Sequence, residues 1–274
     1  MSKIRPFLKW AGNKYQIIER IKAVLPPGNC LIEPFVGSGA VFMNTDYERY
    51  ILADNNADLI NLYLVLQSEG EPFIDYCRSF FTDTNNREDR FYELRDVFNN
   101  TSDNRLKSAL FIYLIRHDFN GLCRYNSKGG FNAPFGEYSK PYFPEKEMRL
   151  FHEKSQKAVF QVADFRDVMR GAEPGSVLYC DPPYVPLSTT ANFTSYSSGG
   201  FTLEDQVDLA NLARELAQKG ISVVISNHAT EFIFNAYQGA EIEKFDVQRY
   251  ISCDGDNRGK AGEVLALFNG GISA

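Results

Sequence analysis

Short apolar runs rich in β-forming residues alternate with helical patterns in two separate parts of the chain. Seven of these runs are candidate strands: Cys30–Glu33, Tyr50–Ala53, Val159–Val162, Val177–Cys180, Val223–Ser226, Ile242–Val247 and Val264–Phe268. Strands that are short, apolar and bounded by helices are typical of a largely parallel sheet covered on both faces. The pattern therefore predicts an α/β fold.

The pattern becomes helical between the second and third candidate strands. The expected helices are Leu59–Leu66, Phe73–Phe81, Phe91–Phe98 and Leu106–Ile115. A stretch rich in Gly, Asn, Pro and aromatic residues follows over residues 118–144, too long for an ordinary connection in a compact domain. The five Phe and Tyr residues from Phe119 to Tyr138 argue against disorder, so we expect a binding loop over residues 118–140.

These changes of pattern predict two domains. Residues 1–56 and 145–274 would form one domain around the sheet, and residues 57–144 would form a helical insertion. Within the first, Thr202 and Asp205 have the spacing of a capping box that opens a helix, which Gly220 would end.

The net charge and the local charge distribution point to different binding partners. The net charge of −6 argues by itself against nucleic acid. Locally, however, residues 3–22 hold six bases and one acid, and residues 105–140 hold six bases and two acids. Residues 57–104 instead hold ten acids and four bases. Two basic segments on an acidic background can form an anion-binding face, but charge alone does not decide this.

Cysteine and histidine spacing favours reduced thiols without a metal. The five Cys residues lie far apart, with no CxxC pair, and the three His residues have no ligand-like spacing with them. No segment has the apolar length of a signal peptide or a membrane span, so we expect a cytoplasmic protein.

The first chemical motif is Glu33-Pro34-Phe35-Val36-Gly37-Ser38-Gly39, between a strand and a helix. Glycines in such a turn let a ligand approach the backbone, and Asp54 at the end of the next strand can accept ribose hydroxyls. Asp164 and Phe165 follow the third strand, where they would meet an adenine ring. The set suggests a nucleoside site without the full dinucleotide fingerprint; the alternative is a structural turn and a surface Asp.

The second motif is Asp181-Pro182-Pro183-Tyr184, directly after an apolar strand. Open α/β sheets bind ligands at this end of a strand, and prolines leave carbonyls free to accept hydrogen bonds. An exocyclic amine on a purine is a poor nucleophile, and a carboxylate with a fixed carbonyl can orient it by accepting its two hydrogens. Asp181, Pro182 and Tyr184 are therefore the candidate catalytic residues. Tyr184 would stack on a base taken out of the helix, and Cys180 would belong to the core.

With these motifs in this order, the chain resembles the DNA adenine methyltransferase family, whose members modify the adenine of GATC. The resemblance covers nearly the whole chain, through FLKWAGNKY, EPFVGSG, ILADNN, NGLCRYN, FNAPFG, KPYFP, YCDPPYVPLS and ANFTSY. DPPY alone is shared with other amino-group methyltransferases, whereas NGLCRYN, FNAPFG and ANFTSY are more specific.

The resemblance implies a Rossmann-like methyltransferase sheet with an inserted, mostly helical DNA-recognition domain and a β-hairpin-like binding loop. It implies S-adenosylmethionine as the cofactor and double-stranded DNA as the partner. We expect no metal, from the Cys and His spacing, and no obligate protein partner is evident from the sequence. The implied cofactor residues are Trp10, Lys14, Phe35, Gly37, Gly39, Asp54, Asp164, Phe165 and Asp181. Taken alone, Trp10 could be core packing and Lys14 a solvated helix start.

The resemblance also places Phe119, Asn120 and Leu122 in the DNA. Arg124 would read a guanine, since Arg binds the O6/N7 edge bidentately; the alternative is a phosphate clamp or a surface salt bridge. The remaining DNA-contact candidates are Lys9, Arg95, Asn126, Asn132, Pro134, Tyr138 and Lys140. Glu137 departs from relatives that often carry a base nearby, and with the acidic net charge it should weaken phosphate attraction.

Other functions remain to be weighed at this point. A methyltransferase acting on cytosine N4, RNA or a protein amide would use the same DPPY chemistry, although the basic, aromatic insertion favours DNA. A non-catalytic DNA-binding protein would have little use for the intact motifs. A nucleotide-dependent dehydrogenase would need the full glycine fingerprint and gives DPPY no role.

Overall fold

The computed structural model describes residues 3–185, 200–248 and 260–270. Two compact units divide the chain. The first unit comprises Met1–Ile18, Val36–Asp46 and Asp54–Val162, and the second comprises Glu19–Phe35, Tyr47–Ala53 and Ala163–Ala274. The expected helical insertion, residues 57–144, falls wholly within the first unit. Its domain boundaries stay a prediction.

The second unit is built on a mixed sheet. Its strands are β1 (Cys30–Glu33), β2 (Arg49–Asp54, whose last residue belongs to the first unit), β4 (Ser176–Cys180), β5 (Ser222–His228), β6 (Glu241–Gln248) and β7 (Lys260–Phe268). They are ordered β2-β1-β4-β5-β7-β6. The first four in that order are parallel, and β7 runs antiparallel to both of its neighbours. Each matches an expected strand, and the α/β prediction is confirmed.

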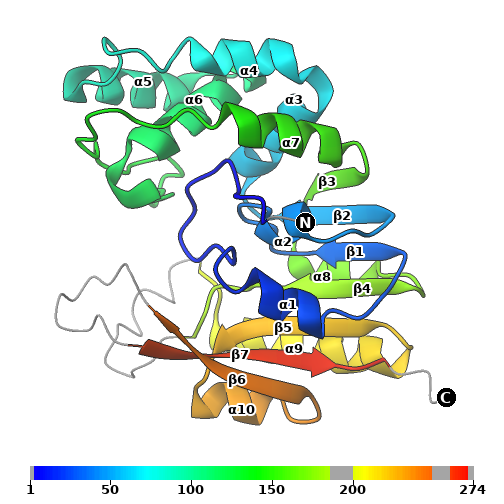
Figure 1. Cartoon of the computed structure of the whole chain (residues 1–274). Helices are drawn as coiled ribbons and strands as arrows, with labels where there is room; N and C mark the ends of the chain where they lie inside the picture. The colour runs from blue at the N-terminus through cyan, green and yellow to red at the C-terminus, as the bar shows by residue number, and fades with distance from the viewer. Residues whose placement is uncertain (1–2, 186–199, 249–259, 271–274) are drawn as a thin grey trace. The chain divides into compact units, whose positions relative to one another are not determined.

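Helices cover both faces of this sheet, because its strands are apolar on both sides. Figure 1 shows α1 (Ile18–Val24) in front of the strands and α8 (Phe165–Arg170) and α9 (Leu203–Gln218) behind them. The short α10 (Glu231–Ala236) packs near α9. The expected capping box is present, since the Thr202 hydroxyl accepts the Asp205 N–H and the Asp205 carboxylate accepts the Thr202 N–H. Both hydrogen bonds fix where α9 begins.

The first unit is mainly helical. It contains α2 (Ala40–Asn44), α3 (Ala57–Glu69), α4 (Glu71–Arg78), α5 (Glu88–Asn100), α6 (Asn104–His117), α7 (Glu145–Ser155) and the strand β3 (Ala158–Val162). Residues 108–115 of α6 are all buried, and α3, α4 and α5 pack against this helix. A helix that is apolar around its whole circumference must be buried.

The stretch after α6 folds back on itself as a hairpin, here defined as residues 118–136. It begins with a 3₁₀ turn, η1 (Phe119–Gly121). Antiparallel bridges join Asp118 to Phe135 and Tyr125 to Phe131, and a tight turn over residues 126–130 connects the two arms. The expected hairpin-like loop is therefore confirmed, with isolated bridges rather than continuous strands.

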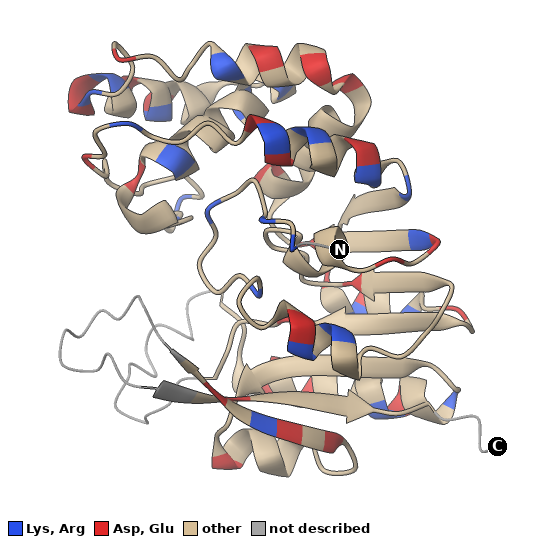
Figure 2. Cartoon of the chain, in the orientation of Figure 1, with Lys and Arg blue, Asp and Glu red and all other residues tan. Residues whose placement is uncertain are grey.

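Charges of both signs are interspersed over the helices (Figure 2). Two basic residues of the segment 105–140 form salt bridges within the first unit. Arg105 pairs with Glu69 and Lys107 pairs with Asp58, both from the acidic segment 57–104. The basic excess of residues 105–140 is accordingly smaller than the sequence count indicates. In the described residues, no helix is long and apolar enough to cross a membrane, and no group of His, Cys, Asp and Glu forms a metal site.

Candidate functional site

The Asp181-Pro182-Pro183-Tyr184 motif leaves the carboxyl end of β4, as the sequence predicted. The parallel neighbour β5 ends beside it, because β4 and β5 are in register from Val177 and Ser222 onward. From β5, the Ser226 hydroxyl donates to Asp181 Oδ1 (2.9 Å). The Tyr179 hydroxyl in turn donates to Ser226 Oγ (3.0 Å), so the hydroxyl between them is oriented toward the carboxylate. The Asp181 side chain is thus held in one direction before any substrate binds.

Tyr184 is partly buried and packs edge-on against His228, with ring centroids 4.7 Å apart. Burial raises the pKa of the Tyr184 hydroxyl well above its ordinary value, so it stays protonated at neutral pH. His228 Nδ1 donates to the Val185 carbonyl oxygen (2.7 Å), which fixes the chain just after the motif. Cys180 is fully buried in the core, as expected.

Four polar residues around this loop were not among the sequence candidates: Gln206 of α9 and Ser226, Asn227 and His228 of β5. Three of them form a polar end, Ser-Asn-His, to the apolar strand Val223–Ile225. A run of polar residues at the carboxyl end of a strand next to DPPY was a usable signal. The sequence around Gln206 gave no such signal, because a Gln early in an amphipathic helix is usually solvent-exposed.

In the first unit, Asp54 accepts backbone donors from the glycine-rich turn. Its Oδ2 accepts the Gly37 N–H (3.1 Å) and its Oδ1 accepts the Asn56 N–H (3.0 Å). Burial raises the pKa of this carboxyl, and these backbone N–H groups act in the opposite direction. Gly37 and Gly39 have φ angles of +46° and +69°, a region that favours glycine, so the motif requires them at both positions.

Trp10 lies against the same turn. A Cβ built on Gly37 would come within 3.1 Å of Trp10 Nε1, so the indole needs glycine there. A pocket of about 210 Å³ is lined by Trp10, Ala11, Asp54, Asn55, Asn56, Leu122, Cys123 and Tyr125. It brings two cofactor candidates, Trp10 and Asp54, together with Leu122 of the hairpin. The Lys14 ammonium is buried and donates to the Gly12 carbonyl oxygen (2.6 Å).

The other cofactor candidates belong to the second unit. The Phe35 and Phe165 rings stack with centroids 5.4 Å apart, and Phe201 packs edge-on against Phe35. Asp164 is the N-cap of α8, where its carboxylate accepts the Arg166 N–H (2.8 Å). Its side chain remains half-exposed.

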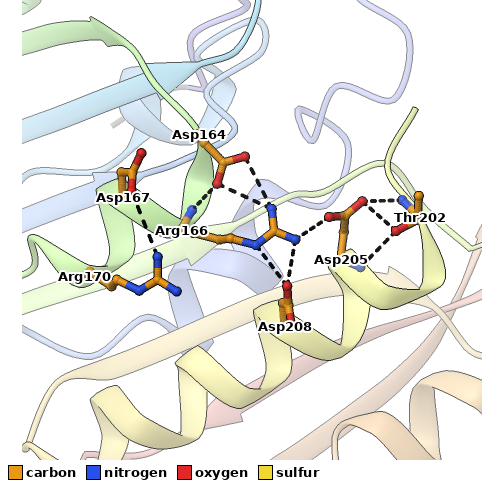
Figure 3. Close-up of polar contacts among 7 residues, drawn as sticks. All are labelled: Asp164, Arg166, Asp167, Arg170, Thr202, Asp205 and Asp208. Atoms are coloured by element: carbon orange, nitrogen blue, oxygen red, sulfur yellow. Dashed lines mark hydrogen bonds and ion pairs between the residues drawn. The ribbon is translucent and has the colours of Figure 1, made fainter. Parts of the chain in front are cut away.

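Arg166 ties this position to α9. Figure 3 shows its guanidinium between Asp164 and two α9 carboxylates, pairing with Asp208 at 2.7 Å and with Asp205. The guanidinium also lies 4.4 Å from the centre of the Phe165 ring. Arg166 therefore contacts both Asp164 and Phe165. These contacts hold the two residues where the sequence predicts that they meet a ligand.

The DNA-contact candidates of the hairpin face solvent at its tip and base. Phe119 is 55% exposed and Leu122 is 36% exposed, so part of each apolar side chain faces solvent. Asn120 lies between them with a φ of +61°, in the left-handed region that Asn adopts more readily than most residues other than glycine.

Arg124 is exposed, and its guanidinium is oriented across the hairpin. Its Nε donates to Asn132 Oδ1 (2.8 Å) and its Nη2 donates to the Asn132 carbonyl oxygen (2.9 Å). The Asn132 side chain therefore binds the Arg124 guanidinium within the hairpin.

The other candidates take part in contacts that shape the hairpin or its neighbours. Lys9 Nζ donates to the Tyr138 hydroxyl (2.8 Å), which also accepts the Asn120 N–H (2.9 Å). Arg95 donates to the Ala133 carbonyl oxygen (3.1 Å). The Asn126 side-chain oxygen accepts two N–H groups of the turn, the Pro134 carbonyl accepts the Phe119 N–H, and Lys140 is exposed. Their contacts with DNA stay predictions, and the ANFTSY motif lies outside the described residues.

Comparison with known proteins agrees with this arrangement. Residues 10–251 match the family model of the D12 class N6 adenine-specific DNA methyltransferases. A DNA adenine methylase of Vibrio cholerae is 50% identical, over 100% of this chain and 99% of that protein. Those of Serratia marcescens and Escherichia coli K12 are 50% and 48% identical, over 98% and 99% of this chain and 100% and 98% of theirs.

Among solved structures, a precorrin 8W decarboxylase from Methanobacterium thermoautotrophicum aligns over 96% of this chain and 94% of its own, with 10% identity. Its TM-score of 0.41 is too low to carry an argument. The sequence relationship is full-length, and the residues matched by the family model span the glycine-rich and Asp-Pro-Pro-Tyr motifs described above. The chain therefore belongs to the D12 class N6 adenine-specific DNA methyltransferase family, enzymes that methylate adenine N6 in DNA.

Proposed function

We propose that this enzyme transfers the methyl group of S-adenosylmethionine to adenine N6 in GATC sites of double-stranded DNA, after the target base has rotated out of the helix. The observation that carries the proposal is the loop after β4, where Ser226 fixes the Asp181 carboxylate next to two prolines. We expect this activity in the cytoplasm, where DNA and the methyl donor are both present.

The loop suits an amine that must be made nucleophilic. Asp181 would accept one hydrogen of the adenine amino group and the Pro182 carbonyl the other, which turns the nitrogen lone pair toward the methyl group. As positive charge develops on the nitrogen, the carboxylate stabilises it and is available to accept a proton. Tyr184 would stack on the rotated base. No nucleophilic side chain is required, because the transfer is a direct displacement.

The residues around Asp54 fit the proposed cofactor. Each of its carboxylate oxygens accepts a backbone N–H and retains capacity for another donor, such as a ribose hydroxyl. The glycine turn brings the backbone close to the Asp54 pocket, and Trp10 supplies an apolar wall. When bound, S-adenosylmethionine supplies a sulfonium methyl group as the electrophile.

The choice of GATC rests on Arg124. A guanidinium has five N–H donors, and Asn132 takes two of them, from Nε and Nη2. Three donors at the tip of the fork are left, the arrangement that pairs with guanine O6 and N7. A residue meant only to attract phosphate would not need this orientation. Phe119 would enter the base step beside the rotated adenine.

Methylation of duplexes that differ by one base tests the proposal directly. The enzyme is incubated with methyl-labelled S-adenosylmethionine and duplexes carrying GATC or each single-base variant, and N6-methyladenine is quantified in the product. We expect label on the adenine of GATC and, because each wrong base pair costs about 1–3 kcal/mol, much slower transfer to the variants. Equal rates on all duplexes would refute GATC selectivity, and label on cytosine would refute the proposed reaction.

The cofactor assignment has its own test. Asp54→Ala should weaken S-adenosylmethionine binding by about 1.5–3 kcal/mol, since a charged hydrogen bond to a ribose hydroxyl is lost. Asp46→Ala removes an exposed acid of the same unit and serves as the control. Titration calorimetry that gives both variants the parent's affinity would reject Asp54 as a ribose ligand.

A further inference from the structure

Two buried amide side chains hold the backbone of the loop that follows β4. Gln206 Nε2 donates to the Pro183 carbonyl oxygen (2.8 Å), and the Val185 N–H donates to Asn227 Oδ1 (3.2 Å). These two peptide groups lie on either side of Tyr184. Gln206 is 1% exposed and Asn227 is fully buried, so water does not compete for either hydrogen bond.

The two amides are also bonded to each other. Asn227 Nδ2 donates to Gln206 Oε1 (3.0 Å) and to the Tyr237 hydroxyl (3.0 Å). Because a carbonyl can only accept and an N–H can only donate, the loop fixes which end of each amide faces it. Gln206 must turn its nitrogen toward Pro183, and Asn227 must turn its oxygen toward Val185. The remaining oxygen and nitrogen then face each other as acceptor and donor.

The amides come from elements that are part of the rigid core. Gln206 lies in the first turn of α9, just after its capping box, and Asn227 lies near the end of β5. Ser226 and His228, the neighbours of Asn227, bind Asp181 and the Val185 carbonyl. The loop is consequently held at residues 181, 183 and 185 by side chains that do not belong to it.

We propose that Gln206 and Asn227 are positioning residues for methyl transfer. They touch no reacting atom; they set the peptide groups around Pro183 and Tyr184 so that Asp181 and the Pro182 carbonyl meet the two hydrogens of the adenine amine. This inference rests on the proposed function of that loop. A purely structural filler would not require amides here, since burying them costs more than burying Leu or Met of similar size.

The test uses nearly isosteric variants that remove these hydrogen bonds. Gln206→Met and Asn227→Leu keep the side-chain volume but cannot bond the loop. Tyr237→Phe is the matched control: it removes a hydroxyl that bonds both Asn227 and Gln206, and among the described residues this hydroxyl has no hydrogen bond to the loop. All three changes disturb the same buried cluster, so a structural effect should be similar in each.

Single-turnover rates, kcat, KM for DNA and the thermal midpoint are measured for each full-length variant with saturating S-adenosylmethionine and GATC duplex. A loop displaced by about 1 Å can lose a rate factor of order 100, so we expect Gln206→Met and Asn227→Leu to transfer roughly 10- to 100-fold more slowly. KM should change less than about threefold, because positioning acts on the chemical step. Tyr237→Phe should stay within about threefold of the parent rate at a comparable thermal midpoint.

If the methyl-transfer rate fell in proportion to the thermal midpoint in all three variants, the proposal would be overturned. A parent-like rate in a folded Gln206→Met would also overturn it. Should Gln206→Met not fold, Gln206→Asn retains an amide with a shorter reach and should still slow transfer; a parent-like rate there would also overturn it. A parent enzyme that methylates no adenine duplex would instead refute the proposed function.

Discussion

The loop after β4 and the 118–136 hairpin differ in their internal bonding and in the side chains that they expose to solvent. The loop is bound by side chains distant in sequence, Ser226, Asn227 and Gln206, all of them buried. The hairpin combines its own bridges and a bond between two of its own residues, Arg124 and Asn132, with bonds from α5, where Asn99 exchanges two hydrogen bonds with the Phe131 backbone. Its apolar candidates for DNA contact, Phe119 and Leu122, remain exposed.

This difference follows from what each region is proposed to do. Groups that stabilise charge in a reaction act best when fixed in a water-poor surrounding, because they need not reorganise during the step. Groups that read DNA must instead face outward and keep free donors. Changes in the loop should therefore alter rate, and changes in the hairpin should alter the choice of sequence.

The largest effect is expected for Asp181→Ala. Loss of the carboxylate should slow methyl transfer roughly 100-fold or more while the fold is retained, because the motif lies at a strand end and not in the core. Single-turnover methylation and circular dichroism measure the two quantities. Asp167→Ala, on the exposed side of α8, is the control and should react like the parent. A folded Asp181→Ala enzyme with near-parent rates would remove the loop from the mechanism.

A smaller and more selective effect is expected for Arg124→Ala. If the oriented fork reads guanine, the change should cost about 1–3 kcal/mol on GATC and little on a duplex altered at that guanine. Lys128→Ala, which removes an exposed base in the same hairpin, is the comparison. It should lower the methylation rate by the same factor on every duplex. Rates on GATC and its variants at two salt concentrations separate these cases. If Arg124→Ala lowered the rate equally on all duplexes, and if the rate then depended less on salt concentration, Arg124 would be a phosphate contact.

The base of the hairpin holds a buried group unlike those around the loop. Asp118 is fully buried, its Oδ1 accepts the Leu122 N–H (3.1 Å), and its Oδ2 has no hydrogen-bond partner among the described residues. Burial raises the pKa of this carboxyl to about 8, while backbone N–H groups and Lys9 act against the rise. The folded state thus favours the neutral acid.

Because its folded pKa lies above its unfolded value of about 3.9, Asp118 stabilises the fold at low pH, and this contribution is lost as pH rises toward 8. Asp118→Asn cannot ionise, so between pH 5.5 and 8 its free energy of unfolding should rise relative to that of the parent by about 3 kcal/mol. Urea denaturation at both pH values measures the difference. Parallel pH dependence in the two proteins would show that Asp118 is already charged when folded.

Local sequence signals predicted much of the fold and part of the candidate site. Short apolar runs predicted every described strand, and Thr202 with Asp205 predicted where α9 begins, since both signals depend on nearby residues. Asp54 and Asp181 could be proposed because motifs at strand ends have a known geometry. A binding loop could be expected here from the Gly and aromatic content, whereas its hairpin-like form was implied by the family resemblance.

The long-range polar contacts could not be predicted in this way. Gln206 and Asn227 are 21 residues apart, and only the packing of α9 on β5 turns both toward the loop. The pairing of Arg124 with Asn132 depends on the hairpin turn, and Asp164 was expected to meet a ligand, although it also caps α8. Which polar partner a side chain finds is decided by tertiary packing, which no local pattern records.

The most direct test of the separation between the two regions is the selectivity ratio, the single-turnover rate on GATC divided by that on a duplex altered at the guanine read by Arg124. It is measured for the parent, Asp181→Asn and Arg124→Ala. We expect Asp181→Asn to slow both duplexes by the same factor and leave the ratio unchanged, and Arg124→Ala to reduce it by roughly 5- to 150-fold. A ratio that falls with Asp181→Asn and survives Arg124→Ala would contradict the assignment of chemistry to the loop and sequence reading to the hairpin.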